Sequence, residues 1–205
     1  MQMRGPDETT PGESRPSVQQ ILAWRKIERQ RLIGARLELS PDIRAAHAVA
    51  IASALDQIIG DVRGKAISTY WPFRGEPDLR DWMDSISQRG GTCLLPVVVE
   101  NKRPLIFRSW EKGEALGRGV WNIPIPIHGR EMTPDIVIAP VVGFDAECFR
   151  LGYGGGFFDR TLAAISTPVL VIGVGYAQQQ ISTIRPQQHD IPMQLIVTED
   201  QVRRR

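Results

Sequence analysis

Cysteine and histidine, the residues that form disulfides and bind soft metal ions, are scarce in this chain. Its 205 residues include two cysteines and three histidines. Cys93 and Cys148 lie far apart and lack the spacing of metal ligands, which argues against a disulfide framework or a thiolate metal site. We expect both thiols in the core of a protein from a reducing compartment. The histidines are equally scattered, so the sequence indicates no catalytic triad.

Long apolar runs and a large net charge are missing as well. No segment reaches the roughly 18 consecutive apolar residues that cross a bilayer, and no secretory signal is present. The formal net charge of +2 is too small to indicate a nucleic-acid partner, and Arg203 to Arg205 are expected to be a solvated tail. We therefore expect a cytoplasmic protein, a monomer or weak homodimer, that binds neither membrane nor nucleic acid.

The composition fits one domain. With 42% apolar residues, the chain can build one substantial core, whereas two domains would each be small. Residues 1–16 are polar and contain several prolines and glycines, which predicts a disordered tail. The domain is expected to cover residues 17–200, with residues 201–205 as a basic tail.

Alternating helical and extended patterns predict an α/β fold. Helices are expected after Ser17, from Pro41 towards Ile59, over residues 78–89 and over residues 157–164. Strands are expected over residues 65–71, 92–99, 104–110, 136–139, 169–174 and 195–198. This alternation favours a single three-layer Rossmann-like domain with a mostly parallel sheet and helices on both faces. Residues 111–134 form a long irregular stretch, of a size typical of lids and binding walls.

A glycine cluster between an arginine and an aspartate is the strongest functional signal. Residues 150–160 read RLGYGGGFFDR and follow an apolar run. Glycines permit positive φ and let the backbone approach phosphate oxygens, while successive N–H groups and a following helix attract an anion. Arg150 adds a permanent charge, and Asp159 has the oxygen chemistry that Mg²⁺ prefers.

Standard nucleotide motifs do not explain this cluster. It lacks the Gly-Lys-Ser/Thr ending of a P-loop, and Phe157 stands where the dinucleotide fingerprint requires its last glycine. On composition alone, a glycine-rich turn between a strand and a helix is an equally good interpretation.

The order of residues around the cluster resembles the signature of a known enzyme family. Residues 139–145 read APVVGFD, and after a short gap residues 150–159 read Arg-Leu-Gly-x-Gly-x-Gly, two aromatic residues and Asp. This order is similar to that of the 5-formyltetrahydrofolate cyclo-ligases, also called 5,10-methenyltetrahydrofolate synthetases.

The resemblance implies an ATP- and Mg²⁺-dependent ligase that acts on 5-formyltetrahydrofolate. The implied products are 5,10-methenyltetrahydrofolate, ADP and phosphate. In this reaction the formyl oxygen is phosphorylated, N10 of the folate attacks the formyl carbon, and phosphate leaves. The protein contributes positioning and charge stabilisation, which agrees with a chain that shows no nucleophilic triad.

The resemblance also implies the residues of the site. ATP would be bound by Arg25, Arg29, Arg150, Leu151, Gly152, Tyr153, Gly154, Gly155, Gly156, Phe157 and Phe158. The folate would be bound by Trp71, Glu76, Trp121, Tyr153 and Phe157. The implied catalytic residues are Arg150 and Asp159, with Asp159 as the Mg²⁺ ligand.

The first predicted helix carries the two implied phosphate ligands. Arg25 and Arg29 are four residues apart, so both lie on one helix face. Without the resemblance, solvated surface charges are the simpler interpretation. We expect Lys26, Arg31 and Arg36 to be such surface charges.

The implied folate ligands each have an alternative interpretation. A carboxylate at Glu76 suits a pterin because it accepts two parallel hydrogen bonds from an amidine-like N–H pair. The alternative is an acid at a helix N-terminus, a role for which Asp78 is better placed. Trp71 and Trp121 can line a ligand site or pack in the core.

Four positions depart from the family pattern. Phe157 and Phe158 replace two tyrosines, Gly155 stands where some members carry lysine, and Gln194 stands where an aspartate is associated with Mg²⁺. A neutral amide is a weaker ligand for a hard cation, and Asp190 is the candidate replacement. Two alternatives therefore stay open: a paralogous ATP-dependent enzyme for another formyl or pterin-like substrate, and a non-catalytic folate- or nucleotide-binding protein.

Overall fold

A seven-stranded sheet forms the centre of the protein. The structure, a computed structural model, describes residues 16–205, so the tail predicted over residues 1–16 lies outside it apart from Pro16. The strand order is β11-β10-β9-β6-β1-β2-β3. The strands are β1 (Ala66–Ser68), β2 (Thr92–Val97), β3 (Ile106–Ser109), β6 (Ile136–Pro140), β9 (Leu170–Val174), β10 (Leu195–Val197) and β11 (Val202–Arg204).

Strand direction confirms the mostly parallel sheet. From β10 through β9, β6 and β1 to β2, every neighbouring pair is parallel. The two edge strands, β3 and β11, are antiparallel to their neighbours. The chain runs outward from β1 to β2 and β3, then returns to β6 on the other side of β1. The boundary between β1 and β6 is therefore a topological switch point, where open α/β sheets bind ligands beyond the strand ends.

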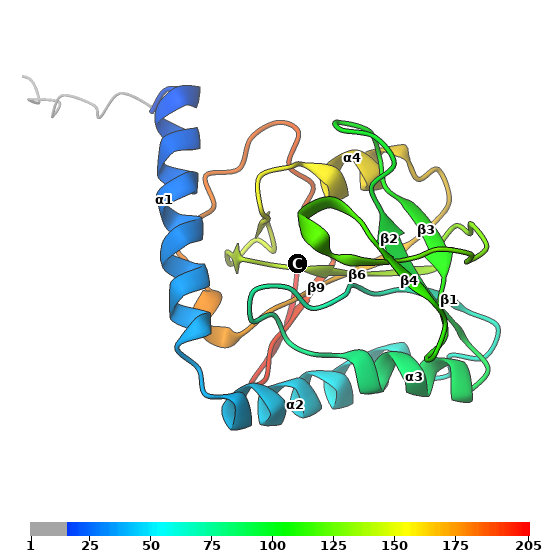
Figure 1. The fold of residues 1–205 in the computed structure, drawn as a ribbon. Coiled ribbons are helices and arrows are strands. Elements are labelled where there is room, and N and C mark those ends of the chain that lie inside the picture. The colour runs from blue at the N-terminus through cyan, green and yellow to red at the C-terminus, as the bar shows by residue number, and fades with distance from the viewer. Residues whose placement is uncertain (1–15) are drawn as a thin grey trace, which may run out of the picture.

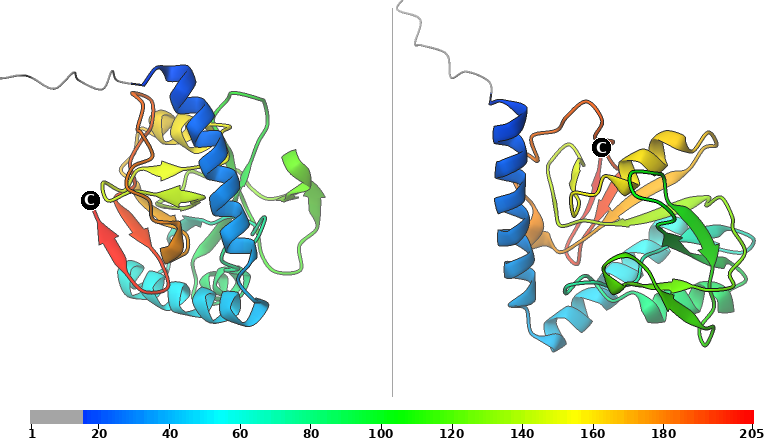
Figure 2. Two further views of the ribbon diagram at one scale, coloured as in Figure 1. Left: turned by 90° about the vertical axis from the view of Figure 1, so that its left-hand side faces the viewer. Right: turned by 45° about the horizontal axis from the view of Figure 1, so that its top comes forward.

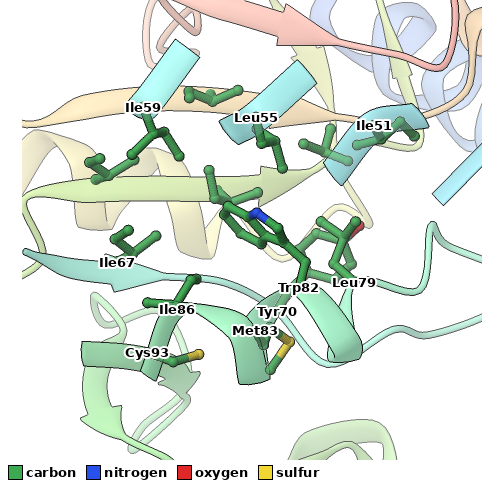
Figure 3. Close-up of a cluster of buried hydrophobic side chains, with 14 of the residues drawn as sticks. Ile51, Leu55, Ile59, Ile67, Tyr70, Leu79, Trp82, Met83, Ile86 and Cys93 are labelled. Carbon is green, nitrogen blue, oxygen red and sulfur yellow. The ribbon is translucent and has the colours of Figure 1, made fainter. Parts of the chain in front are cut away.

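Helices cover both faces of the sheet, as predicted. Helices α2 (Pro41–Ile59) and α3 (Arg80–Gln88) lie against one face and α4 (Phe157–Ala164) against the other (Figure 1). Successive side chains of a strand point to opposite faces of the sheet. Ile67 faces α2 and α3, whereas Ala66 lies in the cluster that includes Leu162 of α4. Figure 3 shows the larger of these two clusters.

Helix α1 (Val18–Leu37) stands beside the sheet rather than on a face of it (Figure 2). Ser17 begins α1 with a capping box that includes Gln20. Ser40 caps α2, with Pro41 at its first position. Both starts match the sequence-based prediction. No helix within residues 16–205 combines the length and apolarity that a bilayer-spanning helix requires.

Two segments differ from prediction. Residues 111–134, expected to be irregular, contain β4 (Leu116–Arg118), the short helix η1 (Val120–Asn122) and β5 (Pro124–Pro126), with β4 and β5 paired. A two-stranded ribbon tolerates these prolines because half of its N–H groups point outward. Arg203 and Arg204, expected in a solvated tail, pair with β10 instead. Charged side chains on such an edge strand oppose further strand addition.

Glycine substitutions provide a direct test of core packing. A Cβ on Gly173 in β9 would lie 2.5 Å from the Ile196 side chain, so Gly173→Ala should destabilise the fold by about 1–3 kcal/mol through overpacking. The matched control, Gly34→Ala in α1, meets nothing within 4 Å and should stabilise the protein by roughly 0.5–1 kcal/mol. Chemical denaturation measures both effects, and equal midpoints for the two variants would contradict the described packing.

Candidate active site

One cleft contains every residue that the sequence analysis assigned to a site. It opens at the carboxyl ends of β1, β2 and β6, beside α1 and the start of α4. Arg25 and Arg29 line it from α1, Trp71 and Glu76 from the segment after β1, and Trp121 from η1. Residues 150–159 form another wall. Segments more than 100 residues apart in sequence thus meet in one place.

A small hairpin positions the glycine-rich loop. Its strands are β7 (Gly143–Phe144) and β8 (Arg150–Leu151), which pair antiparallel. Asp145 holds the turn between them because its carboxylate accepts hydrogen bonds from the N–H groups of Glu147 and Phe149. The same carboxylate accepts from Ile184, which ties the hairpin to the loop before β10. Arg150 is thereby placed directly before the glycines.

The loop geometry requires glycine and leaves its amides free. Gly154 and Gly156 have φ values of 96° and 62°, in the left-handed region. A Cβ on Gly155 would lie 2.7 Å from the Phe157 ring. Within the described chain, no N–H group from Gly152 to Gly156 donates a hydrogen bond. Together with the free first turn of α4, these donors form a cradle for an anion.

Arg150 and Asp159 form an ion pair at the base of this cradle. The Arg150 Nη2 atom lies 3.0 Å from Asp159 Oδ2, and Ile191 donates its N–H to the other carboxylate oxygen. Burial lowers the pKa of Arg150, while Asp159 and Asp190 act in the opposite direction. The Arg150 Nε atom is buried and has no partner among residues 16–205. This arginine therefore retains a donor for a ligand.

Arg25 and Arg29 lie on the same face of α1 but have different surroundings. Arg25 is buried, pairs with Asp190 and donates to the carbonyls of Ile184 and Arg185. Its donors thus hold the loop before β10. Arg29 donates one hydrogen bond, from Nε to the Gly152 carbonyl at 2.7 Å, and its Nη atoms have no acceptor in the described part of the chain. Arg29 therefore offers more donors to an anion than Arg25 does.

Glu76 is a buried acid at the opposite side of the cleft. Its Oε2 atom accepts from the Phe73 N–H at 2.9 Å, and its Oε1 atom accepts from the Tyr153 hydroxyl at 2.7 Å. Burial raises the pKa of Glu76 to about 7, although Arg36, Tyr153 and Phe73 oppose this shift. Each oxygen keeps a further acceptor position for a ligand N–H group.

Arg36 corrects the sequence-based prediction. We expected a surface charge, but its side chain is 0% exposed and lies 3.9 Å from Glu76. Residues 25, 29, 32 and 36 are separated by four, three and four positions, which is the spacing of one helix face. Because Leu32 on this face is also buried, the periodicity itself contained the signal that Arg36 points inward.

An aromatic cluster closes the Glu76 side of the cleft. Phe73 and Trp121 lie nearly parallel, with ring centroids 6.2 Å apart, and Tyr153 is tilted against both rings. Trp121 is 49% exposed and has a φ of 54°, so it is held at the cleft rim rather than in the core. Trp71 instead packs edge-on against Trp110. Phe73 was not singled out in the sequence.

Comparison with known proteins identifies the family. The model of the 5-formyltetrahydrofolate cyclo-ligase family matches residues 21–199. The chain belongs to this family. The cyclo-ligase of Escherichia coli K12 is 30% identical over 149 residues, which cover 69% of this chain and 81% of that protein. The cyclo-ligase of Haemophilus influenzae is 28% identical over 145 residues, covering 66% and 76%.

Solved structures show the same fold. The NMR structure of the Aquifex aeolicus 5,10-methenyltetrahydrofolate synthetase superposes with a TM-score of 0.77 and 28% identity, over 88% of this chain and 92% of that one. A Mycoplasma pneumoniae 5,10-methenyltetrahydrofolate synthetase gives a TM-score of 0.71 at 20% identity, over 86% and 99%.

The cyclo-ligase cleft has two carboxylates that can face a metal. Asp159 and Asp190 line the cleft. The Gln194 side chain does not: it accepts a hydrogen bond from the N–H group of Val171 in β9. Burial by itself raises the pKa of Asp190. Hydrogen bonds from the Arg25 side chain and the Gln187 N–H outweigh this effect, so the pKa of Asp190 lies below its usual value. No group of three metal-ligating side chains occurs within residues 16–205. This donor set fits Mg²⁺ that arrives on phosphates, because such ions need one or two carboxylates.

The buried Glu76 predicts a pH dependence of folding. Its pKa is 4.5 when unshifted and about 7 in the fold, so its contribution to stability is complete below about pH 4.5 and is lost as pH rises through 7. The free energy of unfolding of wild type relative to Glu76→Gln should therefore fall by roughly 3 kcal/mol between these limits. Urea denaturation at several pH values across this range measures the free energy of unfolding of both proteins. If the difference between wild type and Glu76→Gln stayed constant with pH, the burial of a titrating acid would be contradicted.

Proposed function

We propose that the protein catalyses the ATP- and Mg²⁺-dependent conversion of 5-formyltetrahydrofolate to 5,10-methenyltetrahydrofolate, with release of ADP and phosphate. One observation carries this proposal: a single cleft joins an anion cradle to a buried carboxylate surrounded by aromatic rings. The names of the relatives agree with this function. The substrates are therefore small molecules, ATP and the folate.

The glycine-rich side is proposed to bind ATP. Free loop amides, the start of α4 and two guanidinium groups, Arg29 and Arg150, surround the place where phosphates would lie. Such donors are fixed before the ligand arrives, so they stabilise charge without reorganisation. Arg25 contributes by fixing Asp190 beside the cradle rather than by a free donor of its own.

Asp159, with Asp190 nearby, is proposed to hold Mg²⁺. Both carboxylates already accept hydrogen bonds, and each has further oxygen lone pairs. When bound, the ion would neutralise charge on the phosphates. Its other ligands would be phosphate oxygens and water, as is usual for this ion.

The Glu76 side is proposed to bind the folate. A pterin presents an adjacent pair of N–H donors, and the Glu76 carboxylate can accept both in one plane. Phe73 and Trp121 provide flat apolar surface for the ring system, and Trp71 lies further along the same wall. This arrangement would direct the formyl group towards the phosphates.

The proposed chemistry needs positioning more than a protein nucleophile. The formyl oxygen attacks the γ-phosphorus of ATP, the bond to ADP breaks, and the formyl carbon becomes electrophilic. N10 then forms a bond to that carbon, the carbon–oxygen bond breaks as phosphate leaves, and the N10 proton passes to solvent. Arg29 and Arg150 would stabilise the charge on the transferred group. Both buried cysteines lie outside the cleft lining.

The Phe157–Phe158 pair is the observation that keeps other functions open. Arg150 lies over the Phe158 ring at 5.1 Å and Arg160 over Phe157 at 5.3 Å, so the rings support two guanidinium groups but offer no hydroxyl to a ligand. An enzyme for another formyl or pterin-like substrate, or a binding protein without turnover, would be compatible with this change.

A single assay distinguishes the three functions. Purified protein is mixed with 5-formyltetrahydrofolate, ATP and Mg²⁺, and methenyl absorbance and ADP are followed together. Joint appearance of both products, dependent on ATP and Mg²⁺, supports the proposal. Binding without turnover indicates sequestration, and ADP formation only with a different formylated substrate indicates a paralogous enzyme.

Matched arginine variants on α1 test the phosphate site. Arg29→Met removes a charged donor that faces the cradle, so kcat/KM for ATP should fall by about 10²–10³. Arg31→Met is the control because that side chain is largely exposed and, among residues 16–205, forms an ion pair with Glu28 alone. Steady-state kinetics should leave the control near wild type. Equal effects of the two variants would argue against a phosphate role for Arg29.

A further inference from the structure

Arg36 connects three segments that are distant in sequence. From α1 it donates to the carbonyls of Phe73 and Arg74, in the turn that precedes Glu76. It also donates to the Tyr153 hydroxyl, in the glycine-rich loop. The turn is tightly built, since Arg74 and Gly75 both have positive φ, and a Cβ on Gly75 would lie 3.0 Å from the Leu37 side chain of α1.

The Tyr153 hydroxyl is the junction of this network. It lies between Arg36 and Glu76 and donates to the carboxylate at 2.7 Å. The Glu76 carboxylate and the loop that carries Tyr153 both line the cleft, from segments that are 77 residues apart in sequence. A movement of the loop that displaces Tyr153 therefore removes a hydrogen bond from Glu76.

The two charged members of the network are buried, which makes partial arrangements costly. The side chains of Arg36 and Glu76 are 0% and 2% exposed, so neither can replace a lost partner with bulk water. Loss of one member of such a pair leaves a buried charge uncompensated, which is strongly unfavourable. The guanidinium is also planar and rigid, so its donors hold the turn and Tyr153 in one fixed relation.

We propose that Arg36 is a positioning residue that, through Tyr153, couples occupancy of the glycine-rich loop to the orientation of Glu76, so that nucleotide and folate bind cooperatively. This inference rests on the proposed function. A nucleotide that orders the loop fixes the Tyr153 hydroxyl against Glu76, and a carboxylate held in place binds the pterin with less loss of freedom. By linkage, the folate must strengthen nucleotide binding by the same factor.

Binding measurements test the coupling directly. The Kd for 5-formyltetrahydrofolate is measured by calorimetry with and without a non-hydrolysable ATP analogue and Mg²⁺. Wild type should show a ratio on the order of five- to tenfold, and Tyr153→Phe should bring the ratio close to one, whatever the change in the Kd for each ligand alone. A wild-type ratio near one, or a full ratio in Tyr153→Phe, overturns the proposal.

Tyr176→Phe is the matched control. Tyr176 is also a buried tyrosine, but its hydroxyl has no hydrogen-bond partner among residues 16–205 and so forms no hydrogen bond to Glu76. This variant should keep the wild-type ratio. Arg36→Met combined with Glu76→Gln removes both buried charges together, which avoids an unpaired charge. Because Glu76 is the proposed folate ligand, this double variant is tested without folate, by hydrogen exchange of the amides from Phe73 to Glu76, and the ATP analogue should no longer slow that exchange. Slowing as large as in wild type overturns the role of Arg36.

A folate-free measurement separates this inference from the proposed function. Hydrogen exchange of the amides from Phe73 to Glu76 is compared with and without the ATP analogue. Exchange should slow in wild type but not in Tyr153→Phe, because the variant loses the hydroxyl that hydrogen-bonds to Arg36 and Glu76. If folate fails to bind yet this slowing occurs, the proposed substrate is wrong and the coupling holds. If the nucleotide leaves exchange in the turn unchanged, the coupling is wrong.

Discussion

Burial of paired charges at the carboxyl ends of the strands is the constraint on which this structure depends. Three arginine–carboxylate pairs, Arg25–Asp190, Arg36–Glu76 and Arg150–Asp159, lie in or beneath the same cleft, and each side chain is at most 16% exposed. Charges removed from water are costly, and their mutual attraction offsets this only when the geometry is good. Each pair joins segments of the chain that must therefore be placed accurately.

Helix α1 acquires its position from this constraint. It stands beside the sheet (Figure 2). Its inner face contributes Arg25 and Arg36 to the buried pairs and Arg29 to the cleft. Leu32, on the same face, packs with the hairpin that precedes the glycine-rich loop. Two of the four buried residues of α1 are arginines, and such a face would be unstable against an apolar layer. Here it completes a site whose other walls supply carboxylates and carbonyls.

Local signals in the sequence predicted much of this arrangement. Ser17 and Ser40 identified helix starts because capping depends on residues only three positions apart. The roles of Arg36 and Phe73 depend on contacts with residues far away in sequence, so no local pattern revealed them fully. The strands within residues 111–134 were missed because their prolines and glycines are typical of loops. The motif alone aligns Gln194 with a metal-binding aspartate, but its side chain accepts a hydrogen bond from strand β9.

The central claim is that one cleft binds phosphates at the glycine-rich loop and a folate at Glu76. Amide mapping by NMR on uniformly ¹⁵N-labelled protein tests it most directly. A non-hydrolysable ATP analogue with Mg²⁺ should shift the amides from Gly152 to Phe158, and 5-formyltetrahydrofolate should shift those from Phe73 to Glu76 together with the Trp121 indole. Largest shifts at the opposite end of the sheet, or the largest shifts from both ligands in one and the same segment, would contradict the account.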